Sequence, residues 1–114
     1  MMITESRGQS KMCILSIDIE TYSSYDLTEV GVYKYVEASD FEILLFGYAF
    51  DDEPVQVIDL ANFEFLPDEV MNALTNPTII KTAYNANFER TCIAKHFNIP
   101  MYPEQWRCTM VHAL

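Results

Sequence analysis

A four-residue polar turn, Asp51 to Pro54, separates two apolar runs in the middle of this chain. The run before it, Phe41 to Phe50, is almost wholly apolar, and the run after it, Val55 to Ile58, is rich in β-branched residues. Both patterns are typical of strands. So short a loop cannot support the long crossover that joins parallel strands. The two runs are therefore predicted to form an antiparallel hairpin.

The rest of the chain alternates between strand and helix patterns. Besides the hairpin, the predicted elements are strands at residues 12–17, 78–84 and 106–108, and helices around 27–30 and from 67, 87 and 109. The first strand is expected to be buried on both faces and to end near Asp18, because Ser16 is its only polar residue. This order predicts an α/β fold with a mixed sheet, in which antiparallel strands come first and βα units follow.

The charge of the chain limits how it could bind nucleic acid. Seventeen acidic residues against seven Lys and Arg give a net charge of −10, which argues against nonspecific binding through a basic surface. It does not exclude an enzyme of nucleic acids, because a cluster of carboxylates that holds cations repels phosphate only while the metals are absent.

The remaining composition indicates one small domain in a reducing compartment. Residues 1–11 are polar and predicted to be a flexible tail, which leaves 12–114 as the folded part. The sequence has no secretory signal and no apolar stretch long enough to cross a bilayer. The three cysteines, Cys13, Cys92 and Cys108, are odd in number and lack metal-ligand spacing. They are interpreted as buried free thiols of a cytoplasmic protein.

Two acids, Asp18 and Glu20, follow the first apolar run. Side chains alternate along a strand, so both project from the same face. A divalent cation is one partner that would compensate such a pair, and Mg²⁺ and Mn²⁺ prefer carboxylate ligands. The alternative is a strand that simply emerges into solvent at Asp18.

A second group of polar residues lies where the strand at 78–84 gives way to a helix. Asn85-Ala86-Asn87-Phe88-Glu89 begins that helix. Taken alone, Glu89 complements the helix dipole and the two asparagines are ordinary capping residues. Open α/β sheets, however, place their ligands at the carboxyl ends of strands. Asp18, Glu20 and Glu89 are therefore predicted to reach one cleft.

These two motifs resemble those of a known nuclease family. Asp18-Ile19-Glu20-Thr21 resembles the first motif of the DEDD exonucleases, which have an RNase H-like fold, and Asn85 to Glu89 resembles their second motif. The wider sequence is similar to the N-terminal 3′-5′ exonuclease region of phage-type A-family DNA polymerases. The segments that carry this similarity are 15–21, 41–52, 81–92 and 106–114.

The resemblance implies a two-metal mechanism at the 3′ end of single-stranded DNA. In such a site Asp18 bridges two Mg²⁺ or Mn²⁺ ions, Glu20 binds the ion that activates water, and Glu89 holds the second ion. The residues implied to bind the substrate are Thr21, Tyr22 and Asn85. Tyr22 would stack on a base, although a tyrosine beside a strand end is more often a packing residue. The resemblance also implies that a polymerase domain is attached to this one. It further implies that the protein acts in the cytoplasm of a bacterial host or phage-infected cell.

Two departures from the family pattern matter for activity. The second motif usually carries Asp, and this chain has the longer Glu89. The third motif, a Tyr or His followed by the last Asp, does not occur after Glu89: Glu104 lies in a proline-rich loop, and no acid follows His112. The predicted helix from Thr109 reaches the last residue within two turns. We therefore expect a domain incomplete at its C-terminus, with weak or no activity, that folds partially or pairs with a second copy.

Two other functions remain open on the sequence. One is a noncatalytic domain of RNase H-like fold that binds a protein or nucleic acid, with its acids merely solvated. The other is an exonuclease that acts on RNA. The polymerase resemblance favours DNA.

Overall fold

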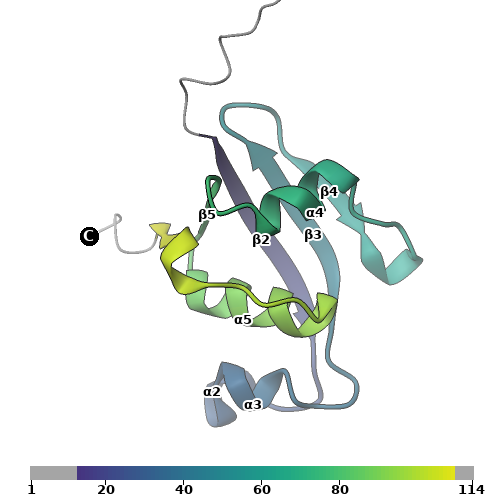
Figure 1. Ribbon diagram of the computed structural model, residues 1–114. Coiled ribbons are helices and arrows are strands. Elements are labelled where there is room, and N and C mark those ends of the chain that lie inside the picture. The colour runs from purple at the N-terminus through teal and green to yellow at the C-terminus, as the bar shows by residue number, and fades with distance from the viewer. Residues whose placement is uncertain (1–12, 110–114) are drawn as a thin grey trace, which may run out of the picture.

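The computed structural model describes residues 13–109 as a five-stranded sheet with helices (Figure 1). The strands are β2 (Ile14–Tyr22), β3 (Glu42–Phe50), β4 (Gln56–Asp59), β5 (Ile80–Ala83) and β6 (Trp106–Cys108). The α-helices are α2 (Leu27–Val30), α3 (Val32–Tyr35), α4 (Asp68–Thr75) and α5 (Ala86–Phe97), and two 3₁₀ helices are η1 (Leu60–Asn62) and η2 (Pro103–Gln105). The predicted tail at 1–11, and His112 in the predicted last helix, lie outside the described residues.

The sheet confirms the predicted fold class. Its strand order is β4-β3-β2-β5-β6. β3 is antiparallel to both β2 and β4, whereas β5 is parallel to β2 and β6 is parallel to β5. The predicted hairpin is therefore present, and βα units follow it. This mixed arrangement is compatible with a partial RNase H-like fold.

The first strand differs from the prediction in length and in burial. β2 does not end near Asp18 but continues to Tyr22, and it alternates between buried and exposed residues. Leu15, Ile17 and Ile19 are buried, while Ser16 and Asp18 between them are exposed. The expectation of a strand buried on both faces was wrong, because a single polar residue in an apolar run was already the start of a solvent-facing row.

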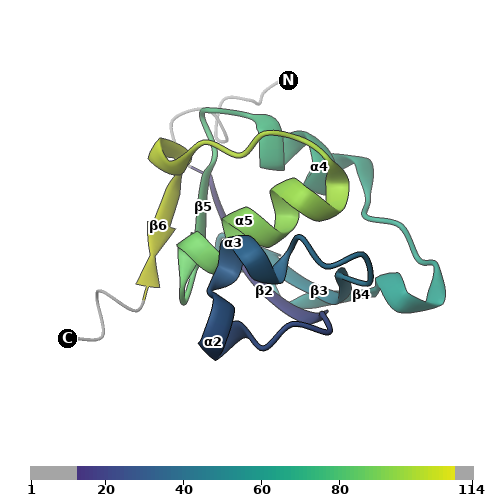
Figure 2. The same ribbon diagram turned by 90° about the horizontal axis from the view of Figure 1, so that it is seen from below.

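The hydrophobic core lies on one side of the sheet. Helices α4 and α5 lie over the same face, as the two views in Figures 1 and 2 show. The largest fully buried apolar side chains come from both layers and are Phe46, Leu15, Ile43, Leu74, Ile93, Val70 and Cys92. Packing of these residues fixes α5 against the middle of the sheet, where it contacts β2, β3, β5 and β6.

The helix termini follow the sequence signals, with one addition. α4 begins at Asp68, next to the predicted helix start at 67, and Asp68 and Glu69 in its first turn complement the helix dipole. Asp26 caps α2 by accepting a hydrogen bond from the Thr28 amide. The sequence did not predict α3, a single turn that follows Gly31, whose φ of +81° favours glycine.

The burial of the cysteines differs from the prediction. Cys13, Cys92 and Cys108 are free thiols, but only Cys92 is buried, and the other two are partly exposed. Within residues 13–109, no helix is long and apolar enough to cross a membrane.

Candidate metal centre at the ends of β2 and β5

The two parallel strands β2 and β5 separate before the predicted acids. β5 pairs with β2 only from Ile14 to Ser16, and β2 continues for six more residues. The first turn of α5 comes to lie beside this continuing part of β2, because α5 begins three residues after β5 ends and contacts β2. The fold thus brings the second motif to the first.

Asp18 and Glu20 lie on the same exposed row of β2, as the sequence predicted. Asp18 pairs across the sheet with Gly47, and a Cβ atom at Gly47 would come within 3.2 Å of the Asp18 carbonyl oxygen. A small cavity of about 120 Å³ lies here, lined in part by Asp18, Gly47 and Val55. The register shifts between Glu20 and Thr21, so the β2–β3 ladder is interrupted directly after the second acid and then continues with Thr21 opposite Ile43.

Glu89 differs from these two acids because it is buried. Only 6% of its surface is exposed, and its Oε1 atom has no hydrogen-bond partner. The pKa of Glu89 is raised to about 7, chiefly by burial and to a lesser extent by the charge of Asp18, while hydrogen bonds from the backbone amides of Glu89 and Asn85 act in the opposite direction. Glu89 is thus held close enough to Asp18 for the two carboxylates to interact.

A cation fits part of this arrangement. A buried carboxylate oxygen without a partner is costly, and a metal ion or a proton would compensate it. The structure brings Asp18 and Glu89 together electrostatically, but within residues 13–109 no group of three or more His, Cys, Asp or Glu side chains is arranged to hold a metal ion. Glu20 lies on the same row of β2 as Asp18 but is not among the charges that shift the pKa of Glu89.

The three predicted substrate-binding residues lie around this centre. Thr21 and Tyr22 follow the acids on β2; the Thr21 hydroxyl lies 2.9 Å from the Tyr35 hydroxyl, and Tyr22 is 51% exposed. Asn85 is the residue before α5, but its side chain makes no capping hydrogen bond. Its carbonyl oxygen accepts from the amides of Phe88 and Glu89, which starts the helix.

The junction between β5 and α5 is fixed by a residue that the sequence did not single out. The Cys108 thiol donates a hydrogen bond to the Tyr84 carbonyl at 3.1 Å and accepts one from the Ala86 amide at 3.5 Å. One side chain of β6 therefore satisfies backbone groups on both sides of the turn that leads to Glu89. Nothing in the local sequence indicated this role, which depends on the parallel pairing of β5 with β6.

A second group that sequence reasoning missed connects α3 to α5. The Tyr33 hydroxyl donates to Asn87 Oδ1 at 3.3 Å, and Arg90 Nη2 donates to the same oxygen at 2.7 Å. Arg90 Nη1 also reaches the Met101 carbonyl at 3.3 Å. Since α3 itself was not predicted, its contact with the second motif had no sequence signal.

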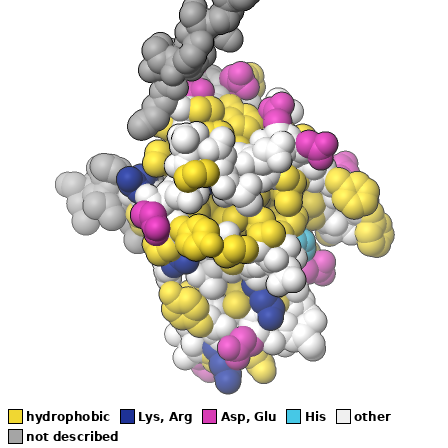
Figure 3. Space-filling model, viewed as in Figure 1, with side chains coloured by type: hydrophobic (Ala, Val, Ile, Leu, Met, Phe, Trp, Pro, Cys, Tyr) yellow, Lys and Arg dark blue, Asp and Glu magenta, His cyan; other side chains and the backbone are white. Residues whose placement is uncertain are grey.

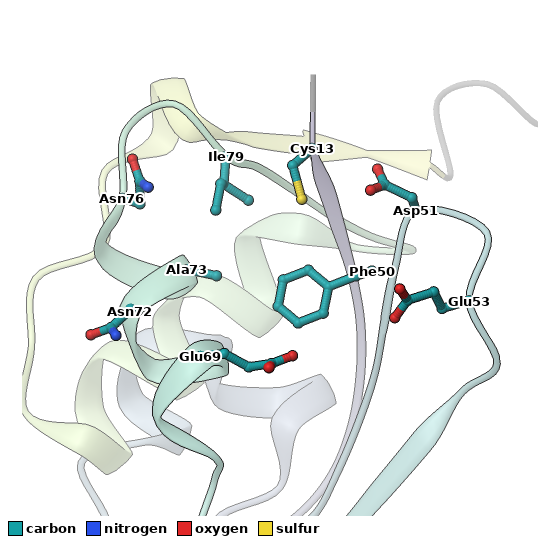
Figure 4. Close-up of a pocket in the computed structure, with 9 residues that line it drawn as sticks. All are labelled: Cys13, Phe50, Asp51, Glu53, Glu69, Asn72, Ala73, Asn76 and Ile79. Atoms are coloured by element: carbon teal, nitrogen blue, oxygen red, sulfur yellow. The ribbon is translucent and has the colours of Figure 1, made fainter. Parts of the chain in front are cut away.

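A larger cavity lies elsewhere, between α4 and the start of β2. Its volume is about 460 Å³, and Figure 4 shows the carboxylates of Glu53 and Glu69 on either side of the Phe50 ring, with Cys13 and Asp51 above it. Burial, together with the charge of Asp51, raises the pKa of the Cys13 thiol. None of the predicted site residues lines this cavity.

Charge on the surface agrees with the acidic composition. On the face seen in Figure 3, Lys and Arg side chains lie at separate places and do not gather into one patch. A nucleic acid would therefore have to be held at this face by something other than a basic surface.

Comparison with known proteins gives one close similarity. The chain is 70% identical over 102 residues to a DNA polymerase of Bacillus phage SP02. The match covers 90% of this chain but only 16% of the relative, so the chain spans about a sixth of that polymerase's length. No protein-family model matches.

Proposed function

We propose that these residues form part of a 3′-5′ exonuclease domain that proofreads for a phage DNA polymerase, in the cytoplasm of an infected bacterium. Such a domain hydrolyses the 3′-terminal phosphodiester of DNA. The observation that carries the proposal is the buried Glu89 carboxyl, whose Oε1 has no partner and which feels the charge of Asp18 on β2. The similarity to a phage DNA polymerase supports DNA rather than RNA as the substrate.

The proposed metal ligands are Asp18, Glu20 and Glu89. When bound, two Mg²⁺ or Mn²⁺ ions supply an activated water and stabilise the leaving 3′ oxygen. Glu89 holds a proton near neutral pH because its pKa is raised to about 7. That proton neutralises the buried carboxylate, and a cation bound at Glu89 would displace it.

Residues around the acids position the 3′-terminal nucleotide in this proposal. The Thr21 hydroxyl is oriented by Tyr35 and lies at the end of the acid-bearing strand. Asn85, exposed at the start of α5, contributes a free side-chain amide. Tyr22 presents an exposed ring on which a base stacks.

The 114 residues alone are expected to turn over DNA weakly or not at all. The fourth acid and the general base of the resembled family do not occur in this sequence. A general base alone contributes about 10²–10⁴-fold to a rate. Full activity is therefore expected only from a chain that also carries a third motif and the polymerase domain.

Manganese titration of thermal unfolding tests the proposal without requiring turnover. We expect the unfolding temperature of the wild type to rise with Mn²⁺, because ligand at 100 times its Kd stabilises a folded protein by about 2.7 kcal/mol. Asp18→Ala should lose that rise. Asp52→Ala, which removes an exposed acid of the turn after β3, should keep it.

Each variant is compared with its own metal-free midpoint, so a change in intrinsic stability does not confuse the result. A wild type that Mn²⁺ does not stabilise, or a rise that survives in Asp18→Ala, would contradict the proposed metal site. Either result would favour the noncatalytic binding domain instead.

A further inference from the structure

The tyrosines of this chain are unevenly distributed over its surface. Five of the seven are exposed, and four of those five lie at the end of the molecule that carries the candidate metal centre. These four are Tyr22, Tyr25, Tyr33 and Tyr84, with exposed fractions of 51%, 42%, 62% and 65%. Tyr22 is the last residue of β2 and Tyr84 follows the last residue of β5, while the other two belong to the α2–α3 segment between β2 and β3.

The α2–α3 segment is fixed to the candidate centre by side-chain contacts. The Ser23 hydroxyl donates to the Tyr35 carbonyl at 2.7 Å, and the Tyr35 hydroxyl meets Thr21. The rings of Tyr35 and Phe88 lie 6.1 Å apart. The segment is therefore connected both to the end of β2 and to the first turn of α5.

Tyr33 makes the most direct of these connections. Its hydroxyl donates to Asn87, two residues before Glu89, while 62% of the side chain remains exposed. A hydrogen bond at the tip with an exposed ring face is an arrangement that holds an aromatic side chain in place without covering it. A ring fixed in this way pays little entropy when a planar group stacks on it.

We propose that Tyr33, together with Tyr22 and Tyr25, forms a stacking platform for the single-stranded DNA that leads to the 3′ end at the acids. The inference rests on the proposed function. Base–aromatic stacking is tolerant of sequence, as a strand of any sequence requires. The chain carries a net charge of −10, so attraction of phosphates to a basic surface cannot supply the affinity for DNA. Stacking on tyrosine rings would supply it instead.

The proposed platform does not include the exposed phenylalanines at the other end of α5. Phe63 and Phe65 are 86% and 87% exposed, beside a cavity that His96 and Phe97 help to line. They have no polar group to keep hydrated and no connection to Asp18 or Glu89. Tyrosine rings next to the acids are better suited to a hydrated, polar strand of DNA.

Binding of a fluorescein-labelled oligothymidine, measured by anisotropy with Mn²⁺ present, tests the platform. Loss of one stacked ring should weaken binding about 10-fold, so we expect that change for Tyr33→Ala. Tyr33→Phe keeps the ring but loses the hydroxyl that fixes it to Asn87, so its loss of affinity should be clearly smaller than that of Tyr33→Ala. Tyr102→Ala is the matched control, because Tyr102 is 53% exposed but lies in the loop before η2. Far-ultraviolet circular dichroism confirms that each variant is folded.

The dependence on salt provides a second readout. Stacking predicts a shallow decrease of affinity with salt, whereas phosphate contacts predict a steep one. Equal binding by Tyr33→Ala and the wild type would overturn the platform, as would an equal loss in Tyr102→Ala. So would a Tyr33→Ala variant that changes self-association but leaves DNA binding intact, since that result indicates a protein interface.

The two proposals fail in different ways. If Tyr33→Ala binds DNA normally while Asp18→Ala loses the Mn²⁺ stabilisation, the platform is refuted and the proposed metal centre stands. If the wild type binds no DNA yet Mn²⁺ stabilises it through Asp18, the outcome is the same. If neither DNA binding nor Mn²⁺ stabilisation occurs, both proposals fall.

Discussion

A buried lysine and a buried glutamate, Lys81 and Glu89, have opposite surroundings. Lys81 has no exposed surface, and its Nζ donates two hydrogen bonds of 2.9 Å, one to the Asn76 carbonyl and one to Gln105 Oε1. Glu89 is 6% exposed, and its Oε1 has no partner. One end of the sheet thus satisfies its buried charge from within the chain, and the other end does not.

This difference separates a structural residue from a candidate functional one. Burial lowers the pKa of Lys81 to about 8 and raises that of Glu89 to about 7, so both groups are shifted toward their neutral forms. Lys81 joins β5 to the loop before it and to η2, and needs nothing more. Glu89 retains an unmet acceptor beside Asp18, and a ligand from outside the described residues would complete it.

The largest expected effect is the loss of the Lys81 connection. Lys81→Ala removes a fully buried side chain and leaves two acceptors without their donor, so we expect a loss of about 3 kcal/mol in the free energy of unfolding. Lys81→Met keeps the apolar stem and should cost about half as much. Urea denaturation measures both. If Lys81→Ala were as stable as the wild type, the two hydrogen bonds would not stabilise the fold, and the contrast with Glu89 would disappear.

The next effect concerns Glu89 and depends on pH. The pKa is about 7 in the folded state and 4.5 in the unfolded state. Below pH 4.5 both states hold the proton; between 4.5 and 7 only the unfolded state releases it, so wild-type stability falls as pH rises through this window. Glu89→Gln should lack this decrease and, without metal, be more stable than the wild type at pH 8 by up to about 3 kcal/mol.

A suitable control for this pH dependence is Glu69→Gln. Glu69 also lies in a first helical turn, that of α4, but it is exposed. Its substitution should leave the decrease between pH 4.5 and 7 unchanged. A Glu89→Gln variant that retained the wild-type pH profile would show that the buried carboxyl is not the group responsible.

Local sequence signals predicted most of the fold. The turn Asp51 to Pro54 fixed the antiparallel hairpin, because loop length alone excludes a parallel connection. Pro67 and the acids after it located the start of α4. These features depend on a few neighbouring residues, so they are visible without tertiary information.

The sequence did not predict features that depend on contacts between distant parts of the chain. The polar row of β2 was interpreted as the end of a strand, whereas Asp18 lies in its middle. Lys81 lies within a predicted strand, and a lysine there is ordinarily expected at the surface. Its burial follows from where η2 places Gln105, twenty-four residues away in sequence.

The sequence predicted which residues make up the candidate site, but not which of them are buried and which are exposed. Sequence motifs identified Asp18, Glu20 and Glu89 as one group, yet they could not show that Glu89 alone would be buried. That asymmetry arises because the first turn of α5 faces the core, which no motif encodes. Tyr33 and its contact with Asn87 were missed for the same reason.

The smallest expected effect tests whether Asp18 and Glu89 act on each other as the structure indicates. Burial is the main cause of the raised pKa of Glu89, and the charge of Asp18 is a lesser one. Asp18→Asn should therefore lower that pKa but leave it above 4.5. Carbon-detected NMR titration of the Glu89 carboxyl measures the change, and Glu20→Gln is the control, since Glu20 is not among the causes of the shift. A larger change of the pKa in Glu20→Gln than in Asp18→Asn would mean that Glu89 interacts with Glu20 rather than with Asp18. The contrast between Glu89 and Lys81, whose partners lie within the chain, would then have to be explained without a cation site at Asp18.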